Sequence, residues 1–181
     1  MKKGSLRRLT MAALCGAVAF VLMFFSFSVP VLSPFAEFDF SALPELIGGF
    51  ILGPIGAIEI IVVKIGLKLL FKGSSSLLTG EAMNLILSLA YVLPALFYYR
   101  KHRTKKGAII GLALGTVISV IVSIFTNIYV IFPIYIKLYG MNWEGILEMC
   151  SAVNPWITSI PTMVAFSIVP FNLISRVVTS L

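Results

Sequence analysis

The chain has 181 residues, of which 59% are hydrophobic and only 12% are charged, and its mean hydropathy is +1.05. Soluble domains are about half apolar and about one quarter charged, so this composition indicates a membrane protein. The sequence contains no GxxxxGK[ST] loop, and we therefore expect no nucleotide hydrolysis by this chain. The net charge of +7 is better explained by basic loops on one side of a membrane than by binding to nucleic acid.

We predict an all-α integral membrane protein in which residues 1–181 form a single transmembrane domain. A membrane-spanning helix needs about 20 apolar residues, so a chain of this length has room for about six spans. In chain order, the apolar runs predict six transmembrane helices at about residues 8–27, 43–52, 54–71, 80–99, 107–136 and 155–178.

Proline and glycine set several of the predicted helix ends, because proline lacks a backbone donor and glycine adopts turn conformations readily. Pro30 is expected to end the first helix, and the Gly53-Pro54 pair separates the second helix from the third. Pro133 is expected to kink or end the fifth helix. We predict that residues 137–154 form the longest loop.

The basic residues fall in three places: before the first helix, between the fourth and fifth helices, and near the C-terminus. They are Lys2, Lys3, Arg7 and Arg8, then Arg100, Lys101, Arg103, Lys105 and Lys106, and finally Arg176. An even number of spans puts all three places on one side, and the excess of Lys and Arg identifies that side as cytoplasmic. We therefore expect cytoplasmic N- and C-termini, while the acidic residues gather at the outer ends and only Glu59 lies within a span.

The predicted second helix, residues 43–52, is too short to cross a membrane. At 1.5 Å per residue it falls well below the hydrocarbon thickness of about 30 Å. Irregular backbone that completes such a span is tolerated only where protein buries it or where it lines a polar cavity. The short helix thus predicts a ligand cavity near the outer face.

Three lysines, Lys64, Lys68 and Lys72, are four residues apart and form one stripe on the predicted third helix. For Lys68 and Lys72 we expect the long side chains to reach up to the outer membrane surface, although a site role also stays open for Lys68. Lys64 lies deeper, where a charge is costly. A role in the cavity, a contact with another subunit and a structural ion pair all remain open for Lys64.

Polar residues share faces near the outer ends of three predicted helices. They are Glu81 with Asn84, Asn127 with Tyr135, and Asn172 with Ser175. A neighbouring helix could satisfy any one of them, but several such faces in one bundle predict a polar-lined ligand site. No catalytic Ser/His/Asp set or metal-binding set accompanies them, and Cys15 and Cys150 are expected to be unpaired thiols.

Small residues recur along the first predicted helix, including Ala13, Gly16 and Ala17. Such spacing lets another helix approach closely. From the spacing alone, packing within this chain is favoured over contact with another subunit.

Four motifs resemble a known family over nearly the whole chain. They are the stretch 38–54, which reads Asp-Phe-Ser…Pro…Gly-Pro, then Gly80-Glu-x-x-Asn84, Asn127-x-Tyr-x-x-x-Pro133-x-Tyr135, and Pro170-Phe-Asn-Leu173. With the Ala13-x-x-x-Ala17 pair, they resemble the substrate-binding S components of energy-coupling factor (ECF) vitamin transporters, and within them the riboflavin-type branch.

The resemblance implies a water-soluble vitamin bound near the outer surface, with the loop between the first two helices as its gate. The implied ligand-binding residues are Asp39, Glu81, Asn84, Asn127, Tyr135, Asn172 and Ser175. The resemblance further implies that Ala13 and Ala17, with Gly16, dock the T transmembrane subunit, while two ATPase subunits (A and A′) supply energy. It implies a prokaryotic plasma membrane, no enzymatic activity, no metal and no cofactor besides the transported vitamin.

One departure from the riboflavin-type pattern concerns the position three residues after Asn172. Members of that branch tend to have lysine there, whereas this chain has Ser175 followed by Arg176. Pyridoxine, hydroxymethylpyrimidine and pantothenate, the ligands of related S components, therefore stay open beside riboflavin. A membrane-embedded enzyme and a ligand-free structural membrane protein are the alternatives from other functional classes.

Overall fold

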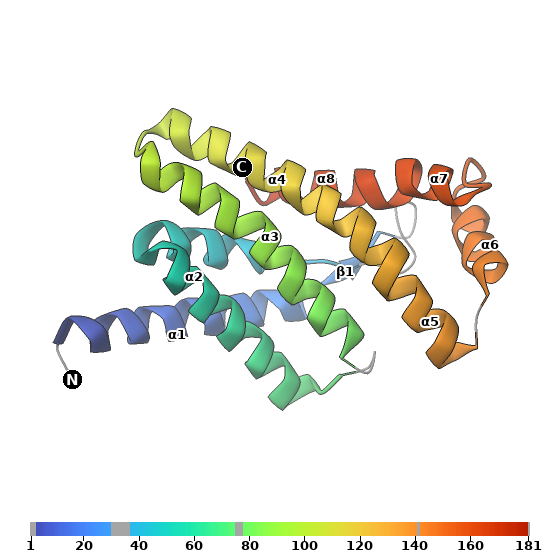
Figure 1. Ribbon diagram of the computed structural model, residues 1–181. Coiled ribbons are helices and arrows are strands. Elements are labelled where there is room, and N and C mark those ends of the chain that lie inside the picture. The colour runs from blue at the N-terminus through green and yellow to red at the C-terminus, as the bar shows by residue number, and fades with distance from the viewer. Residues whose placement is uncertain (1–2, 30–36, 75–77, 141, 181) are drawn as a thin grey trace.

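A computed structural model describes residues 3–29, 37–74, 78–140 and 142–180 as a helical bundle with one short β-ribbon (Figure 1). Lys2 and the predicted helix breaker Pro30 lie outside the described residues. Helix α1 (Lys3–Phe24) begins and ends earlier than the predicted 8–27. The ribbon pairs β1 (Phe27–Ser28) with β2 (Glu37–Phe38) in antiparallel register, which brings the start and the end of the first connection together.

Helix α2 (Ala42–Lys72) contains both the second and the third predicted helices. The predicted break between them is confirmed, because Gly53 has φ 82° and ψ −179° and Pro54 follows it. A positive φ of this kind favours glycine over residues with a side chain. At this point the chain reverses direction, so α2 consists of two arms, residues 42–52 and 54–72 (Figure 1).

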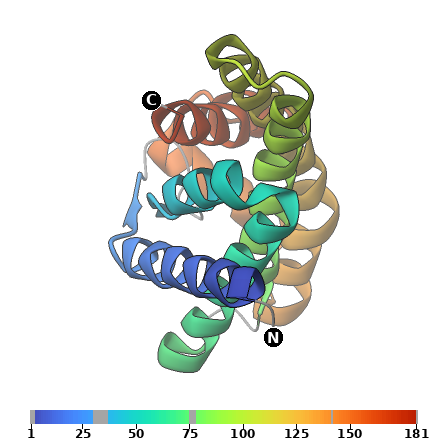
Figure 2. The ribbon, with the colours of Figure 1, turned by 90° about the vertical axis from the view of Figure 1, so that its left-hand side faces the viewer.

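The first four helices pack in the order α1, α2, α3 (Thr79–Lys101), α4 (Lys105–Thr126), as the end view in Figure 2 shows. Glycines bring neighbouring helices close together. A Cβ atom at Gly111 would lie 2.6 Å from the backbone oxygen of Ala95, and one at Gly115 would overlap the backbone oxygen of Tyr91. The α3–α4 contact therefore depends on backbone approach that a larger residue would prevent.

The predicted fifth helix is longer than 107–136 and is not ended by Pro133. Helix α4 continues through a π-helical turn, η1 (Asn127–Ile131), into α5 (Phe132–Tyr139). The N–H of Phe132 donates to the carbonyl of Asn127, five residues earlier. This wider turn next to Pro133 lets the helix continue, because π-bulges absorb local disruption of the regular hydrogen-bond ladder.

The prediction that residues 137–154 form a loop is wrong. This segment contains the end of α5 and an additional helix, α6 (Trp143–Val153). Asn142 caps α6 by accepting a 2.7 Å hydrogen bond from the N–H of Gly145. Ile146 and Cys150, four residues apart, form the buried face of α6. Its short length and its two glutamates hid this amphipathic helix in the sequence.

The last predicted helix begins later than residue 155. The structure has α7 (Ile160–Met163), a second π-helical turn η2 (Val164–Ile168), and α8 (Val169–Val178) as one continuous helix. Ser159 and Thr162 form a capping box at its start, which sets the helix boundary there instead of at Pro155.

Among the described residues, five helices are long and apolar enough to cross a membrane: Leu6–Phe24, Ala42–Lys72, Thr79–Lys101, Lys105–Leu138 and Ile160–Val178. The prediction named six spans, because it counted the two arms of α2 separately. The arm 42–52 alone rises only about 16 Å at 1.5 Å per residue. In Figure 1 the N-terminal end of α1, the turn between the two arms and the α3–α4 connection lie at the same end of the bundle.

Candidate ligand-binding site

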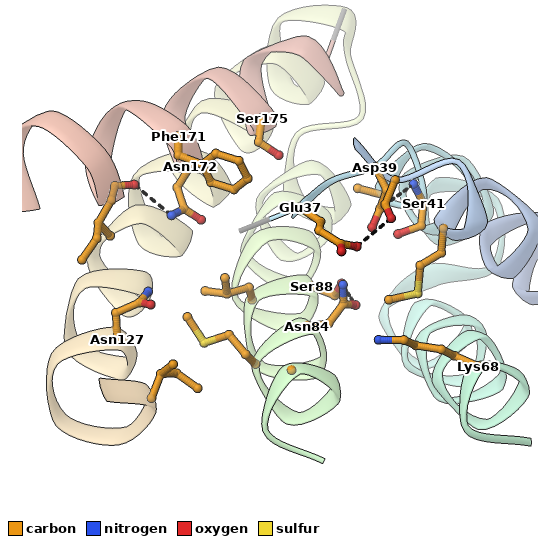
Figure 3. A pocket seen from close by; sticks show the side chains of 18 of the residues that line it. Glu37, Asp39, Ser41, Lys68, Asn84, Ser88, Asn127, Phe171, Asn172 and Ser175 are labelled. Atoms are coloured by element: carbon orange, nitrogen blue, oxygen red, sulfur yellow. Dashed lines mark hydrogen bonds between the residues drawn. The ribbon is translucent and has the colours of Figure 1, made fainter. Parts of the chain in front are cut away.

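A cavity of about 430 Å³ lies between the helices (Figure 3). Its walls come from α1, the β-ribbon, both arms of α2, α3, the η1–α5 turn, α6 and the η2–α8 helix. Cavities that hold small ligands typically measure about 300–1,000 Å³ and combine apolar walls with a few polar groups. The cavity therefore has a volume suited to a vitamin-sized molecule.

Six of the seven predicted ligand-binding residues line this cavity. They are Asp39, Asn84, Asn127, Tyr135, Asn172 and Ser175. They come from four separate parts of the chain, and the fold brings them together around one space. Their role in binding stays a prediction, but the arrangement that such a role requires is present.

Glu81 is the exception, because it is not among the residues that line the cavity. Its carboxylate is buried, lies 2.9 Å from Nζ of Lys68, and accepts a 2.7 Å hydrogen bond from Ser74. Lys68 itself lines the cavity. Glu81 thus holds the ammonium group of Lys68 at the cavity wall.

Asn127 and Asn172 are held in the same way on two different helices. Nδ2 of Asn127 donates to the carbonyl of Ser123 at 2.7 Å, and Nδ2 of Asn172 donates to the carbonyl of Ile168 at 2.9 Å. A carbonyl oxygen only accepts, so in both amides the nitrogen must face the helix backbone. Each Oδ1 is left on the other side as an acceptor for a ligand in the cavity.

Asp39 stands at the entrance to α2, directly after the β-ribbon. Its Oδ1 accepts a 2.7 Å hydrogen bond from the N–H of Ser41 and so fixes the chain as it enters the helix. Ser26, directly before β1, donates to Oε2 of Glu37 in β2 at 2.6 Å, and both residues line the cavity. The ribbon and the start of α2 thus form one polar wall.

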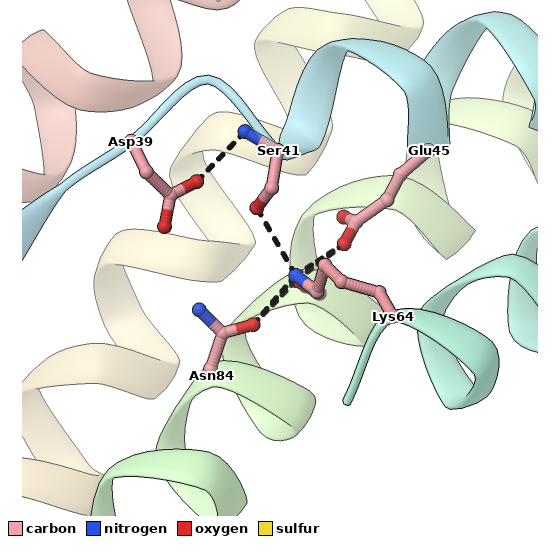
Figure 4. Close-up of polar contacts among 6 residues, drawn as sticks. Asp39, Ser41, Glu45, Lys64 and Asn84 are labelled. Atoms are coloured by element: carbon pink, nitrogen blue, oxygen red, sulfur yellow. Dashed lines mark hydrogen bonds and ion pairs between the residues drawn. The ribbon is translucent and has the colours of Figure 1, made fainter. Parts of the chain in front are cut away.

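Lys64 does not line the cavity but lies behind its wall (Figure 4). Its Nζ is 2.5 Å from Oε1 of Glu45, and both side chains are fully buried. The structural ion pair, one of the possibilities left open for Lys64, is therefore present. Glu45 was not a predicted site residue, because nothing in the sequence indicates that the two arms of α2 fold against each other at this point.

Arg176 also lines the cavity, although it was not among the predicted ligand-binding residues. Its guanidinium lies 4.9 Å from the ring centroid of Tyr91, and its buried Nε has no hydrogen-bond partner. Arg176 lies four residues after Asn172, so the two residues share one face of α8. This spacing was the signal in the sequence that could have identified Arg176 as a cavity residue. A cation thus stands next to Ser175, the position where riboflavin-type members tend to have lysine.

Apolar side chains complete the wall. They include Phe20, Met23, Phe24, Met83, Leu87, Ile131, Phe132, Met163 and Phe171. Cys150 lines the same cavity, and it and Cys15 are free thiols, as predicted. Burial raises the pKa of the Cys150 thiol above its ordinary value. A flat aromatic ring would find apolar contacts here together with polar groups at its edges.

The small residues of α1 do not share one environment. Gly16 is buried against α2, where a Cβ atom would lie 2.6 Å from Cγ1 of Val63, so its predicted role in docking a partner is corrected to internal packing. Ala13 is exposed and Ala17 is partly exposed, so these two side chains are accessible to a neighbouring helix.

Comparison with known proteins gives consistent results. A family model described as "ECF transporter, substrate-specific component" matches residues 7–181. The chain is 31% identical over 175 residues to the riboflavin transporter RibU of Staphylococcus aureus, an alignment that covers 97% of this chain and 85% of that protein. It is 28% identical over 173 residues to the riboflavin transporter FmnP of Bacillus subtilis, covering 95% and 85% of the two chains.

A solved structure titled "Structure and mechanism of the S component of a bacterial ECF transporter" has the same fold. The TM-score is 0.75 with 30% sequence identity, and the match covers 97% of this chain and 90% of that chain. Together with the long apolar helices, these relatives identify a multi-pass protein of a prokaryotic plasma membrane. They are transporter components and not enzymes, and ATP hydrolysis in ECF systems belongs to partner ATPases. The chain belongs to the family of ECF transporter substrate-specific components.

Proposed function

We propose that this S component binds riboflavin, or a flavin closely related to it, for ATP-driven uptake. The observation that carries the proposal is the similarity, over nearly the full length, to two proteins named riboflavin transporters. The proposal needs no resident cofactor, because the vitamin is the transported substrate.

The chemistry of the cavity supports a flavin ligand. Riboflavin has a flat fused ring system whose pyrimidinedione edge carries both donors and acceptors, and a flexible chain of hydroxyl groups. The aromatic and methionine side chains of the wall suit the flat ring, while the amides of Asn84, Asn127 and Asn172 suit a polar edge. Glu37 of the ribbon and Asp39, directly after it, would meet hydroxyl groups.

Arg176 gives this chain a cation close to the position where riboflavin-type members tend to have lysine. Its unpartnered Nε is a buried donor beside the cavity, and such a group gains free energy when a ligand acceptor satisfies it. A second candidate function, import of a smaller vitamin such as pyridoxine, hydroxymethylpyrimidine or pantothenate, is favoured by Ser175 itself, since serine reaches less far into the cavity than lysine.

The proposed topology has six passes with both termini in the cytoplasm and the cavity near the outer face. The reversal at Gly53 makes the arm 42–52 an additional, partial pass. The basic α3–α4 connection and the N-terminal end of α1 lie at one end of the bundle (Figure 1). The cavity is lined by the end of α1 and the start of α3, which are the opposite ends of those helices.

The partners proposed from the family are one T transmembrane subunit and two ATPase subunits. Ala13 and Ala17 are the proposed docking residues, because small exposed side chains on α1 would permit close approach by a helix of the T subunit. Transport would require the whole assembly, whereas ligand binding would require this chain alone.

A binding titration tests the proposal directly. The purified protein in detergent is added to riboflavin, and quenching of flavin fluorescence is followed, with pyridoxine, hydroxymethylpyrimidine and pantothenate as competitors. We expect saturable quenching by one equivalent of protein and no displacement by the other three vitamins. Displacement by one of them, or no quenching, would refute riboflavin as the ligand.

A further inference from the structure

A fully buried lysine ammonium group inside a membrane-spanning helix requires an explanation, and the surroundings of Lys64 supply one. Its Nζ lies among four oxygen atoms: Oε1 of Glu45 at 2.5 Å, Oδ1 of Asn84 at 2.6 Å, and the hydroxyls of Ser41 and Ser88 at 3.2 and 3.3 Å. Glu45 balances the charge, and the three other groups all line the cavity. Lys64 therefore contacts the cavity wall from behind at three points.

The contact with Asn84 determines which end of its amide faces forward. A lysine ammonium group only donates, so Asn84 must turn its oxygen toward Lys64. Figure 4 shows the amide nitrogen of Asn84 on the side away from Lys64. Without the ammonium group, both orientations of the amide would be available.

The orientation of Asn84 is opposite to that of the two other cavity asparagines. Asn127 and Asn172 turn their nitrogens toward backbone carbonyls and keep their oxygens for the cavity. The cavity therefore offers a donor from α3 and acceptors from η1 and α8. A ligand that fits must present an acceptor to Asn84 and donors to Asn127 or Asn172.

We propose that Lys64, neutralised by Glu45, is a positioning residue that fixes Asn84 as a hydrogen-bond donor and thereby selects ligands with an acceptor at that point. The choice of a flavin as the test ligand rests on the proposed function. A flavin satisfies the requirement because its ring system carries acceptor nitrogens and oxygens as well as an N–H group.

The test removes the two buried charges together, because a single replacement would leave its partner charged and buried. In the variant Glu45→Gln/Lys64→Gln, position 64 can donate or accept, so Asn84 is free to turn. The matched control is Arg8→Gln/Glu59→Gln, which removes the 2.8 Å ion pair between α1 and α2. Neither Arg8 nor Glu59 lines the cavity.

Riboflavin is compared with 1-deazariboflavin and 5-deazariboflavin, each of which replaces one ring acceptor by C–H. In the unaltered protein, the analogue that lacks the acceptor facing Asn84 should bind about tenfold or more weakly than riboflavin, because a buried donor loses its partner. The variant Asn84→Ala shows which analogue this is, because it has no donor at position 84 and should bind that analogue as well as it binds riboflavin. Glu45→Gln/Lys64→Gln should reduce the penalty to below about threefold, while the control keeps it. A folded double variant with the full penalty would overturn the proposal.

A measurement on the ligand-free protein separates this inference from the proposed function. The decrease in melting temperature caused by Asn84→Ala is measured in the unaltered protein and in the Glu45→Gln/Lys64→Gln background. If Lys64 holds Asn84, the loss should be larger in the unaltered protein, because contacting residues are not additive. Equal losses would overturn the inference even if riboflavin binds, and unequal losses would support it even if riboflavin does not.

Discussion

Asn172 allows the ligand-binding role of the cavity to be separated from its contribution to stability. The side chain is 6% exposed, donates to the carbonyl of Ile168 in the π-helical turn, and keeps its oxygen for the cavity. Asn172→Ala removes both interactions. The loss of an acceptor opposite a ligand donor should weaken binding by about 1–3 kcal/mol, which is roughly 5- to 150-fold in Kd.

The same substitution also removes an internal hydrogen bond, which should lower the free energy of unfolding by about 0.5–1.5 kcal/mol. Both quantities are measured on one preparation, by riboflavin fluorescence titration and by thermal unfolding. Asn142→Ala is the control, because it removes the α6 cap outside the cavity and should cost about 1 kcal/mol of stability without changing affinity. Wild-type affinity in Asn172→Ala would remove this residue from the site and refute the reasoning.

Three further predictions concern packing, the cavity thiol and the partner surface. Gly115→Val should destabilise the protein by about 1–3 kcal/mol, seen as a lower melting temperature, because the new side chain would overlap the α3 backbone. Cys150 should react with a maleimide more slowly than Cys15 near neutral pH and accelerate as the pH rises, because its raised pKa leaves less thiolate; equal rates by mass spectrometry would contradict this. Ala13→Leu should leave riboflavin binding unchanged but reduce co-purification with the T subunit, and full recovery of the complex would count against docking at this residue. Gly16→Leu should instead lower the melting temperature, because Gly16 packs against α2.

The sequence by itself determined the features that depend on one segment at a time. Hydropathy identified the membrane-spanning helices, because each must supply its own apolar length. The Gly53-Pro54 pair located the break in α2, because backbone conformation there is a local property. Asn84, Asn127, Tyr135, Asn172 and Ser175 were predicted because several polar helix faces in one bundle indicate a polar-lined site, although a neighbouring helix could satisfy any one of them. Asp39 was predicted only from the family motif.

The helix-end predictions failed where the local signal was ambiguous. Pro133 indicates an interruption, but a π-helical turn absorbs it and the helix continues to Tyr139. The segment that became α6 looked like a loop because its charges and its short apolar face resemble a connection between helices. Its helical state depends on burial of Ile146 and Cys150 against other helices, which no local pattern contains.

Only the tertiary structure decided which residues meet. Glu45 and Lys64 lie on different arms of α2, and their contact depends on how those arms rotate and pack after the reversal at Gly53. The same packing turned Gly16 inward and left Ala13 exposed, although both were predicted to dock the partner subunit. Sequence spacing fixes which residues share a helix face, but the direction of that face is set by the neighbouring helices, because inter-helix packing and not local propensity determines the rotation of each helix.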